Sequence, residues 1–375
     1  MSKPIRILQV FTIMNRGGAE SMIMNYYRNI DRTKVQFDFL VHRKERAAFD
    51  DEIESLGGNI YRIIPIRIYN SKKHSKGLQK FFNNNADKYA IIHSHLNTFS
   101  YFVLKEASKY NIPIRIAHSH IALSKVKLTE IFKVESLKNI YKQKLKNKSA
   151  KYTTHLFACG NDAGKWLFGN NKFKVINNAI DTSKFEYAKE KSFENKKELN
   201  LLNKFVVGHI GRFNPQKNHS FIIDIFNEIY KTNPNSVLLL IGNGNLKSQI
   251  KQKVKDLNIE HIVRFLGVQK NIPYYLQAMD VFLFPSLFEG LPVTLVEAQA
   301  SGLKIITSNK VAQESKLTNL VEFMPLEKSA KEWAKTVLQY TYYKREKTSK
   351  LIIEKDYDIK KNALDLQNFY LEQNT

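Results

Sequence analysis

The sequence predicts an α/β protein built from two doubly wound domains, each with a parallel sheet. Short apolar runs, typical of buried parallel strands, alternate with segments whose apolar residues recur at helical spacing. Turns containing glycine follow several of these runs, as expected for strand-helix-strand units. The length of 375 residues suits two to three domains, and 43% hydrophobic with 25% charged residues is an ordinary globular composition.

The first domain is predicted over residues 1–180. Strands are expected at 5–13, 37–41, 60–64, 90–92, 114–117, 152–159 and 174–177, and helices at 22–30, 50–56, 128–150 and from 161. The first helix follows from the spacing of Met22, Ile23 and Tyr26, which share one helical face. The second ends at a glycine pair, which favours helix termination.

The second domain is predicted over residues 205–357. Strands are expected at 205–210, 237–241, 262–266, 281–285 and 303–307, and helices at 221–230, 294–300, 329–340 and, beyond the domain, 359–371. Pro292 suits the start of the helix at 294–300, and Gly302 suits its end. Residues 181–204 are polar and charged, which indicates a linker region, and 177–185 is the expected hinge.

Two glycines follow the first predicted strand directly. Gly17 and Gly18 stand between that strand and the helix at 22–30. Without side chains there, backbone amides can face a phosphate or a hydroxyl. The pair lacks the G-x-G-x-x-G spacing of dinucleotide-binding folds, so the sequence argues against an NAD site.

Histidines follow two strands of the first domain. His93 and His95 come after the strand at 90–92, and His118 and His120 after the strand at 114–117. The carboxyl ends of parallel strands form the ligand crevice of such folds, so these side chains are expected there. Three interpretations remain open: polar groups satisfied at strand ends, a contact to substrate, and a four-histidine zinc site.

Two cations flank the first turn of the second domain. Arg212 and Lys217 lie between the strand at 205–210 and the helix at 221–230. Two positive side chains and a helix N-terminus can converge there on one anion, and a diphosphate fits that arrangement.

The stretch 280–302 places two carboxylates around another strand-to-helix turn. Glu289 precedes the helix at 294–300, and Glu297 lies about one turn inside it. Gly290 lets the backbone approach a ligand closely, and the free amides of a helix N-terminus attract phosphate. Two glutamates at this spacing occur by chance about once in such a chain, so the surrounding pattern carries the interpretation.

That pattern resembles a known family. P-S-x-x-E-G-x-P-x-x-x-x-E-A-x-A-x-G at 285–302, G-R-x-x-x-x-K at 211–217 and the N-N-A-I-D segment at 177–181 resemble motifs of the retaining family 4 glycosyltransferases, including those of capsule or surface polysaccharide biosynthesis. Asn178 stands where that family usually has glycine. The resemblance implies the GT-B fold: two Rossmann-like domains that face each other across a cleft, with residues 358–375 crossing back to the first.

The resemblance also implies which residues form the site. His118 and Glu289 are expected to be catalytic, with His120 as the near alternative to His118. Arg212 and Lys217 are expected at the diphosphate and Glu297 at the ribose hydroxyls. The full expected set of donor-binding residues is Gly17, Gly18, Arg212, Lys217, Gly244, Val268, Glu289, Gly290, Leu291 and Glu297.

The implied reaction moves a sugar from a nucleotide diphosphate, expected to be a UDP-sugar, to a hydroxyl of a lipid-linked saccharide with retained configuration. No cofactor or metal is expected. The D-x-D triplet at 356–358 follows no apolar strand, and helix capping by Asp358 is the preferred interpretation. A nucleotide-sugar epimerase or hydrolase on the same scaffold is the alternative, and a nucleic-acid-binding protein is a weaker one because no recognised binding module is present.

The positive charge of the chain is concentrated in its first half. Residues 1–180 hold 31 Lys and Arg against 13 Asp and Glu, a net +18 of the total +24. The expected helix at 128–150 is lysine-rich on one side and apolar on the other, which predicts docking to an anionic membrane surface or, alternatively, a solvated surface helix. With one cysteine and no apparent secretory signal or membrane span, the expected location is cytoplasmic, at the inner face of the cell membrane.

Overall fold

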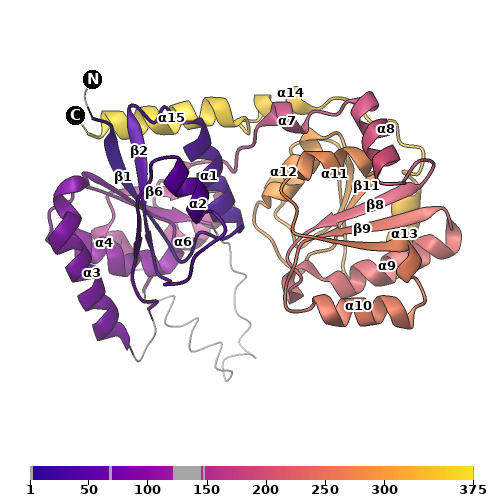
Figure 1. Ribbon diagram of the computed structural model, residues 1–375, viewed down its shortest axis with the longest axis horizontal. Coiled ribbons are helices and arrows are strands. Elements are labelled where there is room, and N and C mark those ends of the chain that lie inside the picture. The colour runs from indigo at the N-terminus through magenta and orange to yellow at the C-terminus, as the bar shows by residue number, and fades with distance from the viewer. Residues whose placement is uncertain (1–2, 67–69, 121–144, 147, 375) are drawn as a thin grey trace. The chain divides into compact units, whose positions relative to one another are not determined.

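The computed structural model describes residues 3–66, 70–120, 145–146 and 148–374. The chain divides into two compact units. Unit 1 comprises Met1–Ala179 and Ile359–Thr375, and unit 2 comprises Ile180–Asp358. Within each unit, helices cover both faces of a parallel sheet (Figure 1), which is the doubly wound arrangement predicted from the sequence.

The sheet of unit 1 has seven parallel strands in the order β3-β2-β1-β4-β5-β6-β7. Their bounds are Ile5–Phe11 (β1), Val35–Val41 (β2), Ile60–Arg62 (β3), Ile91–Ser94 (β4), Ile114–Ser119 (β5), His155–Ala158 (β6) and Lys174–Val175 (β7). The chain builds outward from β1 to β3 and then returns to β4. The strand order therefore reverses between β1 and β4, where doubly wound sheets bind ligands at the strands' carboxyl ends.

Helices pack on both faces of this sheet over two separate apolar cores. They are Gly18–Asn29 (α1), Asp50–Ser55 (α2), Ser71–Asn85 (α3), Ser100–Lys109 (α4), Asn161–Phe168 (α6) and Ile359–Glu372 (α15). The last helix, α15, lies against α1 and β2 (Figure 1). Tyr370 of α15 is fully buried, and its ring meets the ring of Phe37 edge-on at 5.9 Å. The C-terminal helix thus returns to the first unit, as the family resemblance implied.

The sheet of unit 2 has six parallel strands in the order β10-β9-β8-β11-β12-β13. Their bounds are Phe205–Ile210 (β8), Ser236–Ile241 (β9), Val263–Gly267 (β10), Val281–Phe284 (β11), Lys304–Ser308 (β12) and Val321–Met324 (β13). Here the strand order reverses between β8 and β11. The loops that follow these two strands therefore meet at the ligand-binding end of the sheet.

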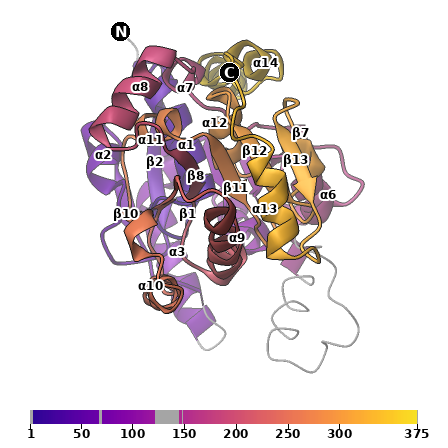
Figure 2. The ribbon, with the colours of Figure 1, turned by 90° about the vertical axis from the view of Figure 1, so that its right-hand side faces the viewer.

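Unit 2 also buries an apolar core on each face of its sheet. Its helices are Thr182–Phe185 (α7), Lys189–Glu198 (α8), His219–Thr232 (α9), Lys247–Asp256 (α10), Ile272–Ala278 (α11), Val293–Ala300 (α12), Ala330–Leu338 (α13) and Ser349–Glu354 (α14). Helices α9 and α13 lie side by side (Figure 2), and Phe221 meets the fully buried ring of Trp333 at 5.7 Å.

The linker predicted at 181–204 is wrong. These residues include α7 and α8, and both helices belong to unit 2. Helix α8 buries no residue fully, so its sequence has the polar composition that suggested a linker. Polar contacts hold it instead: Lys196 Nζ pairs with Asp280 at 2.7 Å, and Asn195 donates to the carbonyl of Tyr274.

Smaller differences concern the ends of elements. Strand β1 ends at Phe11 rather than at residue 13, and β7 covers two residues rather than four. Of the helix predicted at 128–150, residues 128–144 and 147 lie outside the described residues. In the described part of the chain, no helix has both the length and the hydropathy needed to cross a membrane.

Candidate functional site

Besides an ion pair between Lys217 and Glu289, three hydrogen bonds join the β8–α9 and β11–α12 loops of unit 2. The amide of Leu287 donates to the carbonyl of Gln216 at 2.8 Å, and the Gln216 side chain donates to the carbonyl of Phe288 at 3.0 Å. The Asn218 side chain donates to the carbonyl of Pro285 at 3.1 Å. The predicted cationic turn and the predicted carboxylate turn thus form one structure at the strand-order reversal.

Local backbone chemistry holds the cationic turn in shape. Pro215 opens a single 3₁₀ turn, Pro215–Lys217, and the Asn214 side chain accepts from the amide of Lys217 at 3.2 Å. Asn218 then adopts a left-handed conformation with φ of 55°, which asparagine tolerates better than most residues. These constraints fix the direction in which Lys217 leaves the backbone.

Lys217 and Glu289 form an ion pair across the two loops. Lys217 Nζ lies 2.6 Å from Glu289 Oε1, and the side chains are only 15% and 11% exposed. Lys217 Nζ also lies 4.5 Å from the ring centre of Phe284. The carbonyl of Glu289 accepts from the amide of Ala312, which ties this turn to the segment after β12. Arg212, the other predicted cation, is exposed at the start of the same loop as Lys217.

Two glycines after β9 bring a third loop against the cationic turn. A Cβ at Gly242 would lie 2.0 Å from the carbonyl oxygen of Gly211, and one at Gly244 would lie 2.4 Å from the carbonyl oxygen of Phe213. The amide of Phe213 donates to the carbonyl of Asn243 at 3.0 Å. Gly244, predicted at the donor, therefore has a packing reason to be glycine. Gly290 has none, because an added Cβ there would meet nothing within 4 Å.

The remaining predicted residues of unit 2 have contrasting environments. Val268 is 54% exposed and follows Gly267, whose φ is +68°. Leu291 is buried at 6% exposure. Glu297 lies in the second turn of α12, a helix whose N-cap residue, Pro292, makes no side-chain capping hydrogen bond. Burial raises the pKa of the Glu297 carboxyl to about 7, because the charged form loses its hydration.

Replacing Glu297 by Gln is expected to stabilise the unliganded protein at pH 8. Between the usual carboxyl pKa of 4.5 and the folded value of about 7, the unfolded state loses the proton first. Ionisation of Glu297 therefore lowers the free energy of unfolding as pH rises, by up to about 3 kcal/mol. Urea unfolding at pH 4 and pH 8 measures this: the variant should exceed wild type clearly at pH 8 but not at pH 4. The exposed control Glu260→Gln should change neither value, and equal behaviour of the two variants would contradict the assignment.

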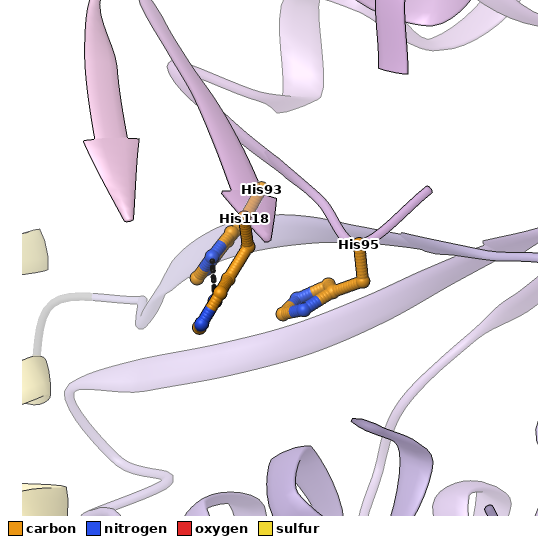
Figure 3. A group of neighbouring side chains, drawn as sticks. All are labelled: His93, His95 and His118. Atoms are coloured by element: carbon orange, nitrogen blue, oxygen red, sulfur yellow. Dashed lines mark hydrogen bonds between the residues drawn. The ribbon is translucent and has the colours of Figure 1, made fainter. Parts of the chain in front are cut away.

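The four histidines of unit 1 form one cluster at the carboxyl ends of β4 and β5. His93 Nε2 lies 3.0 Å from His118 Nδ1, and His95 Nδ1 lies 2.8 Å from His120 Nε2. Figure 3 shows the hydrogen bond between His93 and His118, with the second ring nitrogen of His118 directed away from His93. The rings of His118 and His120 stack with centroids 4.1 Å apart.

Two residues that sequence reasoning missed extend this cluster. Gln9 of β1 has its Oε1 2.9 Å from His95 Nε2 and its Nε2 3.3 Å from the hydroxyl of Tyr370. That hydroxyl lies 2.6 Å from His93 Nδ1. No sequence signal identifies them, because Gln9 lies within an apolar strand and Tyr370 occupies an apolar position of α15.

The zinc interpretation fits this geometry poorly. Nitrogens of His93, His95 and His118 lie within 4.8 Å of one another, as in a metal site. His93 and His95, however, each use both ring nitrogens in hydrogen bonds, so in this arrangement only one nitrogen each of His118 and His120 is unpartnered among the described residues. Zinc sites use three or four protein ligands. Burial lowers the pKa of all four imidazoles, that of His120 to about 3, so the rings are neutral.

The last predicted residues lie at the ends of elements. Gly18 is the first residue of α1, and Gly17 precedes it. The amide of Gly17 donates to the carbonyl of Asn15 at 2.8 Å. Gly17, Gly18 and His118 belong to unit 1, and the other predicted site residues belong to unit 2. In the D-x-D triplet, Asp358 accepts a hydrogen bond from the Thr182 hydroxyl at 2.7 Å.

The matches to known proteins include a family model and two relatives that each cover a large part of the chain. The family model described as Glycosyl transferases group 1 matches residues 190–354. A putative glycosyltransferase, EpsF of Bacillus subtilis (strain 168), is 32% identical over 375 residues, which cover 97% of this chain and 96% of EpsF. The UDP-Gal:alpha-D-GlcNAc-diphosphoundecaprenol alpha-1,3-galactosyltransferase of Escherichia coli is 35% identical over 238 residues, 60% of this chain and 58% of that enzyme.

A solved structure matches along the whole chain. The crystal structure of Anabaena Alr3699/HepE in complex with UDP and glucose has a TM-score of 0.77 and covers 98% of this chain and 99% of its own. Because only 18% of the residues are identical, this similarity is evidence of a shared fold and of nothing else.

Proposed function

The chain belongs to the group 1 glycosyltransferases, which are GT-B and family 4-like, and on that premise we propose that it transfers a sugar from a UDP-sugar to a hydroxyl of a lipid-linked saccharide with retained anomeric configuration. The proposed setting is assembly of a surface polysaccharide. The E. coli relative supports donor and acceptor class, since its name specifies UDP-Gal and a saccharide on diphosphoundecaprenol.

The observation that carries the proposal is the Lys217–Glu289 pair at the strand-order reversal of unit 2. A diphosphate that leaves a sugar gains negative charge, and cations already held in place stabilise that charge as it develops. Lys217 is held by its turn and by Glu289, and Arg212 is exposed on the same loop. Both are proposed to bind the diphosphate, together with the uncapped N-terminus of α12.

The two carboxylates are proposed to bind hydroxyls, for which a carboxylate is an acceptor. Glu289 would bind the donor sugar beside the diphosphate, and Glu297 would bind the ribose. The departing phosphate takes the acceptor proton, so no protein nucleophile is needed, and His118 contacts the donor sugar. With two side-chain cations at the diphosphate, transfer is proposed to proceed without a metal, so chelation by EDTA should leave the rate unchanged.

The test is transfer from a panel of UDP-sugars to saccharide-diphosphoundecaprenol acceptors, with the product's anomeric configuration determined by NMR. The donor is first found by thermal shift, since a ligand at 100 times its Kd adds about 2.7 kcal/mol of apparent stability. Retained configuration, and loss of more than tenfold in Arg212→Ala and Glu289→Ala, are expected. Conversion of the donor without any acceptor would instead show an epimerase or a hydrolase.

A lipid-linked acceptor predicts reversible docking to anionic membranes. The net charge of +18 over residues 1–180 is the basis, since each Lys or Arg close to an anionic surface contributes about 1 kcal/mol. Sedimentation with vesicles should show binding to anionic but not neutral lipid, lost at high salt. Changing Lys142, Lys144, Lys146 and Lys148 to Glu should weaken it. The control variant has four lysines of unit 2 changed to Glu: Lys247, Lys251, Lys253 and Lys255. If both variants bind anionic vesicles equally well, docking does not use the lysines at 142–148.

A further inference from the structure

The histidine cluster of unit 1 contains two buried ring nitrogens with no partner among the described residues. They are His118 Nε2 and His120 Nδ1. A neutral imidazole has one N–H donor and one lone pair, so each hydrogen bond that a ring makes fixes the role of its other nitrogen. Because all hydrogen bonds of the cluster connect to Gln9, the roles of the two unpartnered nitrogens can be followed from that side chain.

One branch runs from the Gln9 amide nitrogen to His118. This nitrogen donates to the hydroxyl of Tyr370, so the hydroxyl proton is given to His93 Nδ1. His93 therefore carries its proton on Nε2 and donates it to His118 Nδ1. His118 in turn carries its proton on Nε2, and its unpartnered nitrogen is a donor.

The other branch runs from the Gln9 amide oxygen to His120. This oxygen accepts from His95 Nε2, which leaves a lone pair on His95 Nδ1. That lone pair accepts from His120 Nε2. His120 therefore carries its proton on Nε2 and its lone pair on Nδ1, so its unpartnered nitrogen is an acceptor.

The pairing of one donor with one acceptor does not depend on how the Gln9 amide is oriented. Exchanging its oxygen and nitrogen reverses every hydrogen bond in both branches. His118 then presents the lone pair and His120 the N–H. The stacked pair presents one of each in either case.

We propose that the His118–His120 pair binds a single neutral hydroxyl, with Gln9 and Tyr370 as positioning residues that assign the two roles. A hydroxyl both donates and accepts, and so satisfies both nitrogens, whereas a carboxylate can only accept and an ammonium can only donate. Stacking of the rings at 4.1 Å keeps the two nitrogens on adjacent rings. The assignment of this hydroxyl to a sugar rests on the proposed function. The pairing of one donor nitrogen with one acceptor nitrogen rests on the hydrogen bonds alone.

The tautomers can be measured directly on the full chain with ¹⁵N-labelled histidine, using long-range ¹H–¹⁵N correlations and single His→Gln variants for assignment. At pH 7, His118 and His120 are expected to be neutral and to carry the proton on the same ring nitrogen, Nε2 with Gln9 as placed. Proton positions that differ between the two rings would leave two donors or two acceptors and would overturn the proposal. An imidazolium at either ring would also overturn it.

The positioning role of Tyr370 is tested by removing its hydroxyl. Tyr370→Phe keeps the ring against Phe37 but removes the hydroxyl, so His93 and His118 should show a mixture of tautomers while His95 and His120 keep theirs. Tyr27→Phe is the matched control, because its hydroxyl bonds to Gln36 in the same core outside the cluster. Unchanged ¹⁵N shifts of His118 in Tyr370→Phe would remove Tyr370 from the proposal.

Binding is tested without donor or acceptor, so that its failure is separate from failure of sugar transfer. Glucose is the neutral hydroxyl probe and acetate is the matched carboxylate. Saturable ¹⁵N shifts of His118 and His120 with glucose, and none with acetate, are expected. No shift with glucose, or equal shifts with both compounds, would overturn the hydroxyl site.

Discussion

Replacing Lys217 by Ala is expected to reduce kcat for sugar transfer by about 100- to 1000-fold, the range found when one preorganised donor to a developing negative charge is removed. The loss has two sources. The diphosphate loses a cation that is held at the strand-order reversal, and the Glu289 side chain, only 11% exposed, loses its partner at 2.6 Å. The variant should therefore also bind the donor more weakly.

Two further variants separate these sources. Lys217→Ala combined with Glu289→Gln also removes the unpaired carboxylate, and should recover part of the donor affinity lost in Lys217→Ala but not kcat. Lys231→Ala is the matched control, because Lys231 pairs with Glu228 on the exposed face of α9. Its kinetics should stay within about twofold of wild type, since surface ion pairs contribute little. Retention of half the wild-type kcat by Lys217→Ala would show that Lys217 is not at the diphosphate.

Gly242→Ala is expected to lower the free energy of unfolding of unit 2 by about 2–5 kcal/mol, through steric overlap and backbone strain. The new Cβ would lie 2.0 Å from the carbonyl oxygen of Gly211, which is backbone and cannot rotate away. The φ of +136° at Gly242 is also a conformation that residues with a Cβ rarely adopt. Urea unfolding followed by Trp333 fluorescence, in a Trp166→Phe background, reports on unit 2 alone.

Gly290→Ala is the same chemical change in open surroundings. Because nothing lies within 4 Å of the added Cβ, its free energy of unfolding should match wild type within about 0.5 kcal/mol. Donor binding should weaken nevertheless, since the methyl group would occupy space proposed for the donor. Equal unfolding midpoints for the two variants would refute the packing role given to Gly242.

The fold and the two loops of unit 2 were predictable because each depends on a local pattern. Strand β8 has the bounds predicted from its apolar run, and Arg212 to Lys217 follow it as the motif indicated. The ion pair between Lys217 and Glu289 was not predictable from either motif, because 72 residues separate them. It requires β8 and β11 to be neighbours, and strand order is a property of the whole sheet.

The histidine cluster shows a different limit of sequence reasoning. His93 and His118 lie near the ends of β4 and β5, which are consecutive in the sequence. Consecutive strands are usually neighbours in the sheet, so the proximity of these histidines could be predicted. Gln9 and Tyr370, which connect the cluster, are 361 residues apart, and each fits an apolar pattern in which its polar atoms carry no signal. The polar composition of α8 misled in the opposite direction, since that helix is held by polar contacts.

The return of α15 to unit 1 has a consequence for synthesis of the protein on the ribosome. Residues 180–358 form unit 2 as one continuous stretch, so every residue of this unit has been translated before the last helix is. Unit 1 begins first but lacks Ala363, Leu366 and Tyr370 from its core until the last helix, α15, has been translated. Unit 1 is therefore the last unit to have all of its core residues translated, although N-terminal domains generally fold first. A nascent chain that stops before residue 359 would carry a complete unit 2 beside a unit 1 with an exposed apolar face.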